Sequence, residues 1–247
     1  MKTNQKGIHF LSIVLFFLGT ILGMGLFGSI VLADLEAKFY FGGIKIAEED
    51  LKTLHCPPII TPIDRSAVKA TITNNTNRTI KPLYRMNVSN NSEITRLVET
   101  IPEIAPGETL QVEWVVNPED AIYGNLILVK VMQYKTIKTP SREATCGTLV
   151  LKIPYLSGSQ VLITGIFSSL VLMGLGIILW LKSNRPLIGR SLNVRNAMLF
   201  LVVLIGAGMI VACFGSWMLG IILLTICLLL IVASINFLVT PEKFNRI

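Results

Sequence analysis

Four long, uncharged apolar runs constrain this chain more than any other feature of its sequence. They contain no Asp, Glu, Lys or Arg and comprise residues 9–33, 161–181, 197–214 and 217–239. A helix needs about 20 predominantly apolar residues to cross a bilayer, within a range of about 17 to 25. The composition agrees, because 15% of the residues are charged, against about 25% in soluble domains. The sequence therefore predicts a membrane protein with four transmembrane helices.

The first of these runs has a second interpretation. Lys2 and Lys6 precede it, and the small residues before Asp34 are typical of a signal-peptide cleavage site. Its apolar length exceeds the roughly 7–15 residues of a signal-peptide core, which favours a retained helix. The sequence leaves both interpretations open.

Basic residues are concentrated in three short segments. Residues 1–8, 182–196 and 240–247 together hold eight bases and one acid, whereas residues 34–160 hold fourteen of each. Cytoplasmic loops carry an excess of Lys and Arg. Both termini and the 182–196 loop are therefore predicted to be cytoplasmic, and residues 34–160 to lie outside the plasma membrane. The bases of the central loop are also candidate contacts for anionic lipid headgroups: Lys182, Arg185, Arg190 and Arg195.

Between the first and second apolar runs the pattern changes to an alternation of period two, which is typical of half-buried strands. In residues 66–73, for example, Val68, Ala70 and Ile72 alternate with polar residues. Turn residues separate about seven such segments, and Pro82 in one of them indicates an edge strand or a bulge. The sequence predicts an antiparallel β-sandwich over residues 56–157, after a juxtamembrane connector at 34–55.

Three stretches of this region, "ATITNNTNRTI", "IAPGETLQVEWVV" and "AIYGNLILVKV", resemble the bacterial immunoglobulin-like or fibronectin type III-like domains of surface proteins. The resemblance covers residues 57–153. It implies an α+β membrane protein in which an Ig-like antiparallel β-sandwich ectodomain is inserted between the first transmembrane helix and a bundle of three further helices. Such domains act mainly as spacers and binding modules, and the resemblance implies no particular functional residue.

Cys56 and Cys146 are the two cysteines outside the apolar runs. Cys56 lacks the small-residue motif of a lipid anchor, and no cluster of Cys and His near it has the spacing of a metal site. Two cysteines in an exported domain indicate a disulfide. In immunoglobulin-like topologies the first and last strands are often neighbours, which agrees with a bond between Cys56 and Cys146.

The same domain contains four Asn-x-Ser/Thr sites, at Asn74, Asn77, Asn87 and Asn90. They are glycosylation acceptors if the protein passes through a eukaryotic secretory pathway. Asn and Thr are also good turn residues, and the bacterial character of the domain favours that interpretation. Whether these sites are glycosylated stays open.

Small residues in the apolar runs are candidate helix-packing positions because they let helix backbones approach closely. They are Gly19, Gly23, Gly174 and Gly206, with Gly28, Gly176 and Gly208 as further candidates. Motifs for catalysis are lacking, since the sequence has no glycine-rich phosphate loop, no cluster of metal ligands, no nucleophile elbow and only two histidines. We therefore expect a non-enzymatic protein without cofactor, metal or catalytic residues.

The expected function is binding: the extracytoplasmic domain would bind or scaffold a protein or a cell-wall polymer. The alternative is an accessory subunit of a membrane transport complex or another multi-subunit membrane complex, because three further helices exceed what an anchor needs. The expected partners are the lipid bilayer and a protein in the membrane or outside it, and nothing indicates nucleic acid. The sequence leaves the ligand, the partner and the oligomeric state open.

Overall fold

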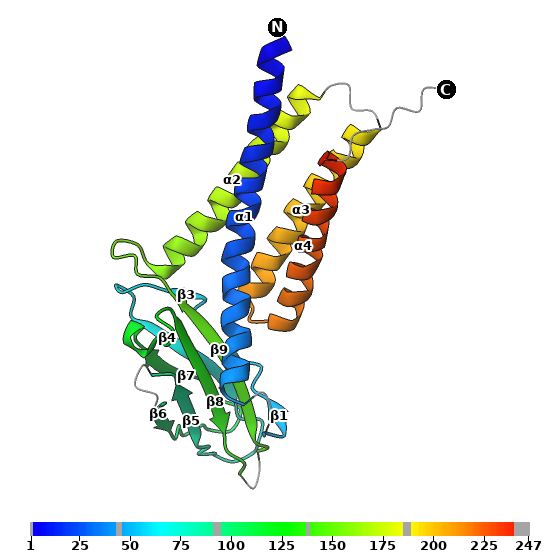
Figure 1. The fold of residues 1–247 in the computed structure, drawn as a ribbon. Coiled ribbons are helices and arrows are strands. Elements are labelled where there is room, and N and C mark those ends of the chain that lie inside the picture. The colour runs from blue at the N-terminus through cyan, green and yellow to red at the C-terminus, as the bar shows by residue number, and fades with distance from the viewer. Residues whose placement is uncertain (1, 43–45, 91–94, 137–138, 185–188, 240–247) are drawn as a thin grey trace. The chain divides into compact units, whose positions relative to one another are not determined.

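The computed structural model describes residues 2–42, 46–90, 95–136, 139–184 and 189–239. The chain divides into two compact units, whose elements are labelled in Figure 1. The helical unit comprises Met1–Gly28, Ile163–Ala212 and Met218–Ile247. The sandwich unit comprises Ser29–Leu162 and Cys213–Trp217.

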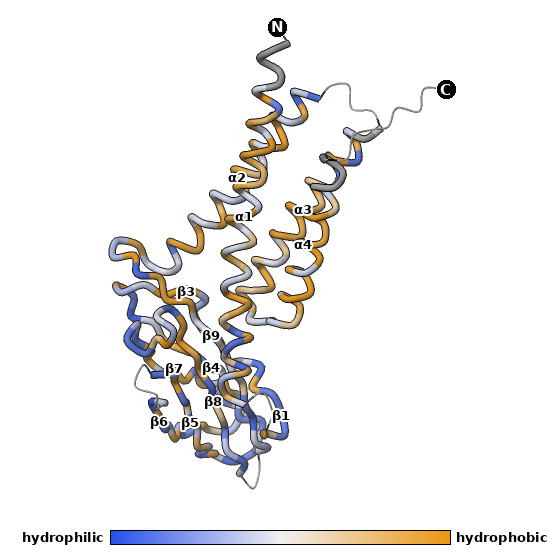
Figure 2. The backbone as a smooth tube through the Cα atoms, in the orientation of Figure 1, coloured by the Kyte–Doolittle hydropathy of each residue, from blue (hydrophilic) through white to orange (hydrophobic). Residues whose placement is uncertain are grey.

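Four helices account for the apolar runs: α1 (Lys2–Tyr40), α2 (Gly158–Ser183), α3 (Arg190–Cys213) and α4 (Trp217–Val239). Within the described part of the chain, each of the four is long and apolar enough to cross a membrane. Figure 2 shows hydrophobic residues along all of them. The four helices fit the multi-pass membrane protein that the sequence predicts.

Helix α1 packs against α2 and α3 in the helical unit through small residues. A Cβ atom at Gly19 would lie 2.8 Å from the Ser169 carbonyl oxygen on α2. The Ser169 hydroxyl donates a hydrogen bond of 2.8 Å to the Gly19 carbonyl oxygen. A Cβ atom at Gly23 would lie 2.8 Å from Ile205 on α3. The absence of side chains at these glycines therefore lets the three helices approach closely.

The sandwich unit contains two β-sheets. The strands are β1 (Glu49–Asp50), β2 (Leu54–His55), β3 (Ile59–Ile60), β4 (Ser66–Thr73), β5 (Tyr84–Val88), β6 (Arg96–Thr100), β7 (Thr109–Val116), β8 (Leu126–Gln133) and β9 (Arg142–Val150). One sheet has the order β1-β9-β8-β5-β6, with β3 also paired to β9. The other sheet has the order β2-β4-β7.

The two sheets share one hydrophobic core. It includes Val68 and Ala70 from β4, Trp114 from β7, Met86 from β5 and Val129 from β8, all almost fully buried. The two sheets therefore pack against each other around this core. Burial alternates along β4, as the period-two pattern predicts.

Two pairings differ from the expected antiparallel arrangement. Strands β1 and β3 both run parallel to β9, whereas the other strand pairs are antiparallel. Both parallel pairs join segments that are far apart in the chain. Between β1 and β3 the chain passes through β2, which belongs to the other sheet.

Two boundaries also differ from those expected from the sequence. The first strand begins at Glu49, within the expected connector. Pro82 was expected in an edge strand or at a bulge, but it lies before β5, which begins at Tyr84 between β8 and β6, so the edge-strand interpretation is wrong. Since Pro82 has no backbone N–H to donate to a ladder, regular pairing starts after it.

Helix α1 continues past residue 33 into the sandwich unit. Its 39 residues give a length of about 58 Å, roughly twice the hydrocarbon thickness of about 30 Å. Ile30, Ala33, Asp34 and Ala37 are buried, at a spacing that places them on one helix face. The expected connector at 34–55 therefore starts as helix.

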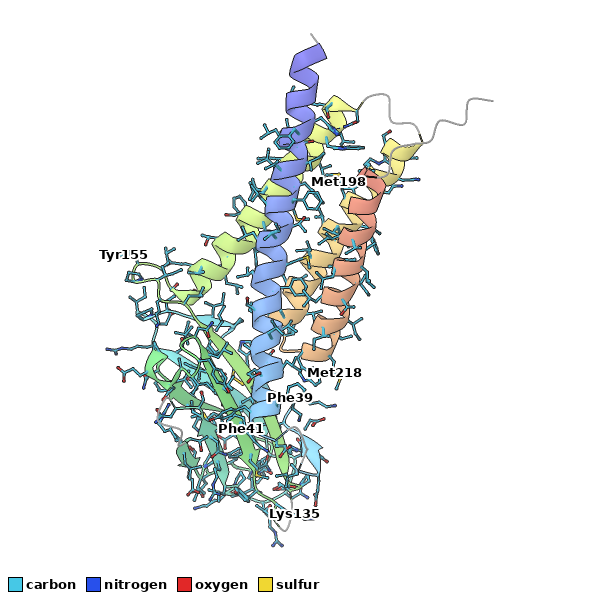
Figure 3. The ribbon with its side chains drawn as sticks, in the orientation of Figure 1. Phe39, Phe41, Lys135, Tyr155, Met198 and Met218 are labelled. Carbon is cyan, nitrogen blue, oxygen red and sulfur yellow. A yellow bond between two sulfur atoms is a disulfide. The ribbon has the colours of Figure 1, made fainter. Side chains whose placement is uncertain are left out.

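The end of α1 covers part of the sheet that contains β8 and β9. Ala37 packs with Leu128 of β8, and the rings of Tyr40 and Phe41 join this cluster. These two rings lie 5.0 Å apart. Phe39 is exposed, and Figure 3 shows Phe39 and Phe41 at the end of α1.

Candidate functional site

A polar groove lies at the end of the sandwich where β9 begins. We use the name "polar groove" for the depression bounded by residues 48–53 around β1, by 71–73 and Asn75 at the end of β4, and by Gln133 and Arg142. Its volume is about 660 Å³, which lies within the roughly 300–1,000 Å³ of typical ligand sites. Both sheets contribute to it, because β1 belongs to one sheet and β4 to the other.

Backbone hydrogen bonds fix the wall of the groove that contains β1. The Glu49 amide donates to the Ser141 carbonyl oxygen at 3.1 Å, and the Leu51 amide donates to the Glu143 carbonyl oxygen at 3.0 Å. The Glu143 side chain is itself buried and lies 3.3 Å from the Lys130 ammonium group. This wall is therefore held along β9 at several points.

Charges of both signs lie along the same wall. The Arg142 guanidinium donates to a Glu49 carboxylate oxygen at 2.9 Å, and the Lys135 ammonium donates to a Glu48 carboxylate oxygen at 2.5 Å. Both pairs are exposed, and such pairs contribute little to stability, typically about 0–1 kcal/mol. Their main effect is to orient the acidic side chains at the rim of the groove.

Below the rim, Gln133 is held in a fixed orientation. Its side-chain oxygen accepts a hydrogen bond of 2.9 Å from the Tyr84 hydroxyl, and both residues are buried. Burial raises the pKa of the Tyr84 phenol, so the phenol stays protonated and remains a donor. On the β4 side, the hydroxyls of Thr73 and Thr109 lie 2.9 Å apart.

The groove is lined mainly by hydrogen-bonding and charged side chains. It presents hydroxyl, amide, carboxylate and ammonium groups around the small apolar surface of Leu51 and Ile72. Hydrogen-bonding groups of this kind match a chain of sugar hydroxyls or a peptide backbone. Across the described ranges, no group of three or more His, Cys, Asp or Glu residues could hold a metal ion.

Two carboxylates fix the ends of α1 and α2 to the sandwich strands. The first is Asp34 on α1, whose Oδ1 accepts a hydrogen bond of 2.9 Å from the buried Gly147 amide of β9. A Cβ atom at Gly147 would lie 2.1 Å from the Ala33 carbonyl oxygen. Helix and strand backbones therefore touch directly at this glycine. Gly215, between α3 and α4, also lies close, since its Cβ position is 3.9 Å from Asp34 Oδ2.

The second carboxylate, Asp64, belongs to the loop between β3 and β4 and faces the first residue of α2. Its Oδ2 accepts hydrogen bonds from the Gly158 amide at 2.8 Å and from the amide and hydroxyl of Thr61. A Cβ atom at Gly158 would lie 2.0 Å from the Ile59 carbonyl oxygen of β3. A carboxylate at a helix N-terminus is favourable because unpaired amides and the helix dipole meet there.

These attachment residues were not found by sequence reasoning, although weak signals exist. A glycine inside a strand, as in the "TCGTL" that contains Gly147, indicates close approach of another backbone. The spacing of Ser157 and Gln160 matches a capping box, and the Ser157 amide donates to Gln160 Oε1 at 3.0 Å. The partners Asp34 and Asp64 have no such local signal.

The structure contains the predicted disulfide between Cys56 and Cys146. Their Cα atoms lie 6.1 Å apart, within the usual range for disulfides. The bond joins the segment between β2 and β3 to β9. The disulfide therefore links the chain segment that passes from one sheet to the other to β9, the strand that also contains Gly147.

The other sequence-derived residues are dispersed. Gly19 and Gly23 lie at helix contacts, whereas a Cβ atom at Gly174 or Gly206 would meet nothing within 4 Å. Gly176 of α2, which was also a candidate from the sequence, is a contact, since its Cβ position lies 2.8 Å from Phe16 of α1. Nothing local in the sequence distinguishes Gly176 from its neighbour at position 174.

The basic residues of the 182–196 loop are only partly described. Arg185 lies outside the described residues, as does the tail at 240–247, and the Arg190 side chain is also not described. Lys182 is exposed at the end of α2. Arg195 lies on α3 and donates to the Asn196 side chain at 2.9 Å.

Asn74 is a structural turn residue. It is fully buried, and its Nδ2 group donates to the carbonyl oxygens of Arg78, Ile104 and Ala105. Its Oδ1 accepts from the Thr76 amide at 3.0 Å. The nitrogen that would carry a glycan is therefore used inside the fold, whereas Asn77 is exposed.

Comparisons with known proteins identify no family for this chain. No family model matches it, and no curated protein matches it. One solved structure to which it is similar is the crystal structure of Bacteroides uniformis β-glucuronidase, with 9% identity and a TM-score of 0.27. The similarity covers 36% of this chain and 12% of that one, so the chain spans a small part of that protein. A similarity at this level carries no information on fold or function.

Proposed function

We propose that this chain is a non-enzymatic integral membrane protein whose Ig-like sandwich lies outside the cell membrane and binds a polar partner. The polar groove is the observation on which this proposal rests. It is large, it is built by both sheets, and one of its polar groups, the Gln133 side chain, is held in place by the buried Tyr84.

The groove is placed to meet a partner because it lies at the end of β9 that is remote from the chain segment leading to α2. The groove lies beside Arg142, where β9 begins, whereas β3 pairs with β9 at Leu149 and Val150. A strand of nine residues is about 30 Å long. Gly158, at the start of α2, adjoins β3, so the groove and the chain segment leading to α2 lie at opposite ends of β9. Figure 3 shows Lys135 and Tyr155 at these two ends.

Binding in the groove is testable with a matched pair of variants. Thr73 and Thr109 share one hydrogen bond and are both exposed, but only Thr73 borders the groove. Thr73→Arg places a long side chain in the groove, and Thr109→Arg removes the same bond outside it. We expect Thr73→Arg to weaken co-sedimentation of the full chain with purified cell-wall polymer, or capture of a co-purifying protein, at least tenfold. Equal binding by both variants would contradict the proposal.

Sidedness is a separate requirement. In a Cys213→Ala and Cys227→Ala background, which removes the two free cysteines, single cysteines are introduced at Tyr155 and at Lys182. A membrane-impermeant maleimide added to intact cells should label the first position only. Labelling at Lys182 without labelling at Tyr155 would reverse the proposed topology.

A second candidate, an accessory subunit of a membrane complex, is favoured by the number of helices. One spanning helix anchors a domain, whereas four helices of the described chain meet the length and hydropathy of a span. Helix α4 is largely exposed, with Met218, Ile222 and Leu229 each more than half accessible. A stoichiometric multi-span partner after mild detergent extraction would favour this candidate over the first.

A further inference from the structure

Strand β2 leaves part of the edge of β4 uncovered beside the polar groove. β2 pairs with β4 at Lys69 and Ala70, whereas β7 pairs with all eight residues of β4. The chain turns just before β2, where the Leu54 amide donates to the Leu51 carbonyl oxygen at 3.2 Å. On the side of β2, none of the described strands therefore continues the sheet beside residues 71–73, which border the groove.

The backbone groups of Thr73 face this gap in the sheet. At the next residue, the Asn74 amide donates to the Glu108 carbonyl oxygen at 2.9 Å, and the Asn74 carbonyl oxygen accepts from the Gly107 amide at 2.9 Å. Both backbone groups of Asn74 therefore face the β7 side. Because the backbone groups of successive residues in an antiparallel ladder face opposite edges, those of Thr73 face away from β7. Within the described ranges, neither the amide nor the carbonyl oxygen of Thr73 has a hydrogen-bond partner.

A second unpaired donor borders the groove at Gln133. This residue is 2% exposed and belongs to the groove lining. Its Oε1 atom accepts a hydrogen bond from the Tyr84 hydroxyl, which fixes the orientation of the side-chain amide. Across the part of the chain that the structure describes, the N–H groups of Nε2 have no acceptor. Since buried donors in folded proteins are almost always hydrogen-bonded, Nε2 is an open donor for an oxygen atom of a ligand.

We propose that the polar groove binds an extended peptide segment of a partner protein, which adds a short strand beside β4. The peptide backbone pairs with the amide and the carbonyl oxygen of Thr73, and a peptide carbonyl oxygen accepts from Gln133. This binding mode rests on the proposed function, in which the groove binds a polar partner, and it names the class of that partner.

The unpaired groups match a polypeptide strand rather than a sugar chain. An extended peptide presents a donor and an acceptor on each edge at every second residue, so one peptide residue satisfies both backbone groups of Thr73. Sugar hydroxyls each act as donor and acceptor and lack this alternation. The side chains of an added strand also alternate between the two faces. Those on the inner face meet Leu51 and Ile72, the apolar part of the groove lining.

Selection of peptides on the full chain tests this binding mode. A phage-displayed library of random heptapeptides is selected on the parent chain in lipid nanodiscs, with the Thr73→Arg chain as counter-selection. Peptides that bind only the parent chain are then synthesised with a methyl group on one backbone nitrogen at a time. We expect affinity losses of at least tenfold at alternate positions, where the N–H faces β4, and of less than about twofold between them. Enrichment of no peptide, or losses without alternation, would overturn the proposal.

A pair of proline variants removes one edge amide at a time. Thr73 and Thr109 lie opposite each other, and since the backbone of Thr73 faces away from β7, that of Thr109 faces away from β4. Thr73→Pro therefore removes an amide at the gap, and Thr109→Pro removes one at the opposite edge of the sheet. Both also remove the hydrogen bond between the two hydroxyls. We expect Thr73→Pro alone to weaken binding of the selected peptides, by at least tenfold, and equal affinities for both variants would contradict strand addition.

Hydrogen exchange of the unsubstituted chain gives a measurement that depends on no variant. A saturating selected peptide should slow exchange of the Thr73 amide at least tenfold and leave exchange of the Thr109 amide unchanged. Unchanged exchange at both amides, or equal slowing at both, would overturn the proposal.

Purified cell-wall polymer separates failure of the peptide assignment from failure of the proposed function. If the polymer binds the parent chain and Thr73→Arg weakens that binding, while no library peptide behaves in this way, only the peptide assignment fails. If polymer, peptides and captured proteins all bind Thr73→Arg and Thr109→Arg equally, the proposed function fails with it.

Discussion

The contact between α1 and β9 predicts that Gly147→Ala releases the end of α1 from the sheet. The added Cβ would lie 2.1 Å from the Ala33 carbonyl oxygen, whereas ordinary contact begins at 3.4 Å. Helix and strand must therefore separate by more than about 1 Å, and overpacking of this kind costs about 1–3 kcal/mol. The same movement lengthens the hydrogen bond from Gly147 to Asp34, and bonds to charged groups contribute about 1.5–3 kcal/mol. Because one displacement causes both losses, we expect about 2–4 kcal/mol rather than their full sum.

Hydrogen exchange of the full chain measures this release directly. A loss of 2–4 kcal/mol corresponds to exchange that is roughly 30- to 1,000-fold faster in peptides covering 29–40 and 142–150. Asp34→Ala removes the hydrogen bond without the clash and should give a smaller effect, about 1–3 kcal/mol. Gly206→Ala is the control, because its Cβ position is open. If Gly147→Ala changed exchange in both peptides by less than twofold, α1 would not be held on β9 as described.

Three further predictions concern stability. Replacing Cys56 and Cys146 by Ser should lower the free energy of unfolding by up to about 4–5 kcal/mol, because the disulfide spans 90 residues and restricts the unfolded chain. In thermal unfolding, reductant should destabilise the parent chain but not the variant. Asn74→Asp removes the two N–H donors of Nδ2 and should cost about 1–3 kcal/mol in chemical denaturation, and a cost below 0.5 would refute the turn role. Asp64→Ala removes the cap at Gly158 and should cost about 0.5–2 kcal/mol, seen as faster exchange at the start of α2 but not in α3.

The elements that depend on local pattern were predicted well from the sequence. The apolar runs appear as four helices, and the alternation of Val68, Ala70 and Ile72 appears as β4 with the predicted bounds. Each of these predictions depends only on the spacing of apolar residues within one segment and on the environment that the segment faces. The disulfide was also predictable, because two cysteines outside the apolar runs leave one pairing.

The features missed by sequence reasoning depend on contacts between distant segments. The polar groove combines residues 48–53 with Gln133 and Arg142, and no local pattern places these side by side. Asp34 and Gly147 are likewise far apart in the chain. The end of α1 was expected to be a connector because charge returns at Asp34, but its buried spacing continues to Ala37. There the sheet provides the apolar surface that the helix covers.

Strand β9 connects the features that matter most for the proposed function. It bears Arg142 at the groove, Cys146 in the disulfide, Gly147 against α1 and Leu149 beside β3. A ligand that displaces the backbone at Arg142 must either deform this strand or shift it as a unit, and close-packed interiors resist deformation. Any shift would be opposed at Gly147, where the backbones of α1 and β9 touch. A groove ligand that slows hydrogen exchange in residues 29–40 would therefore indicate that binding is coupled to the first membrane helix. Slower exchange limited to residues around the groove would indicate a passive binding module.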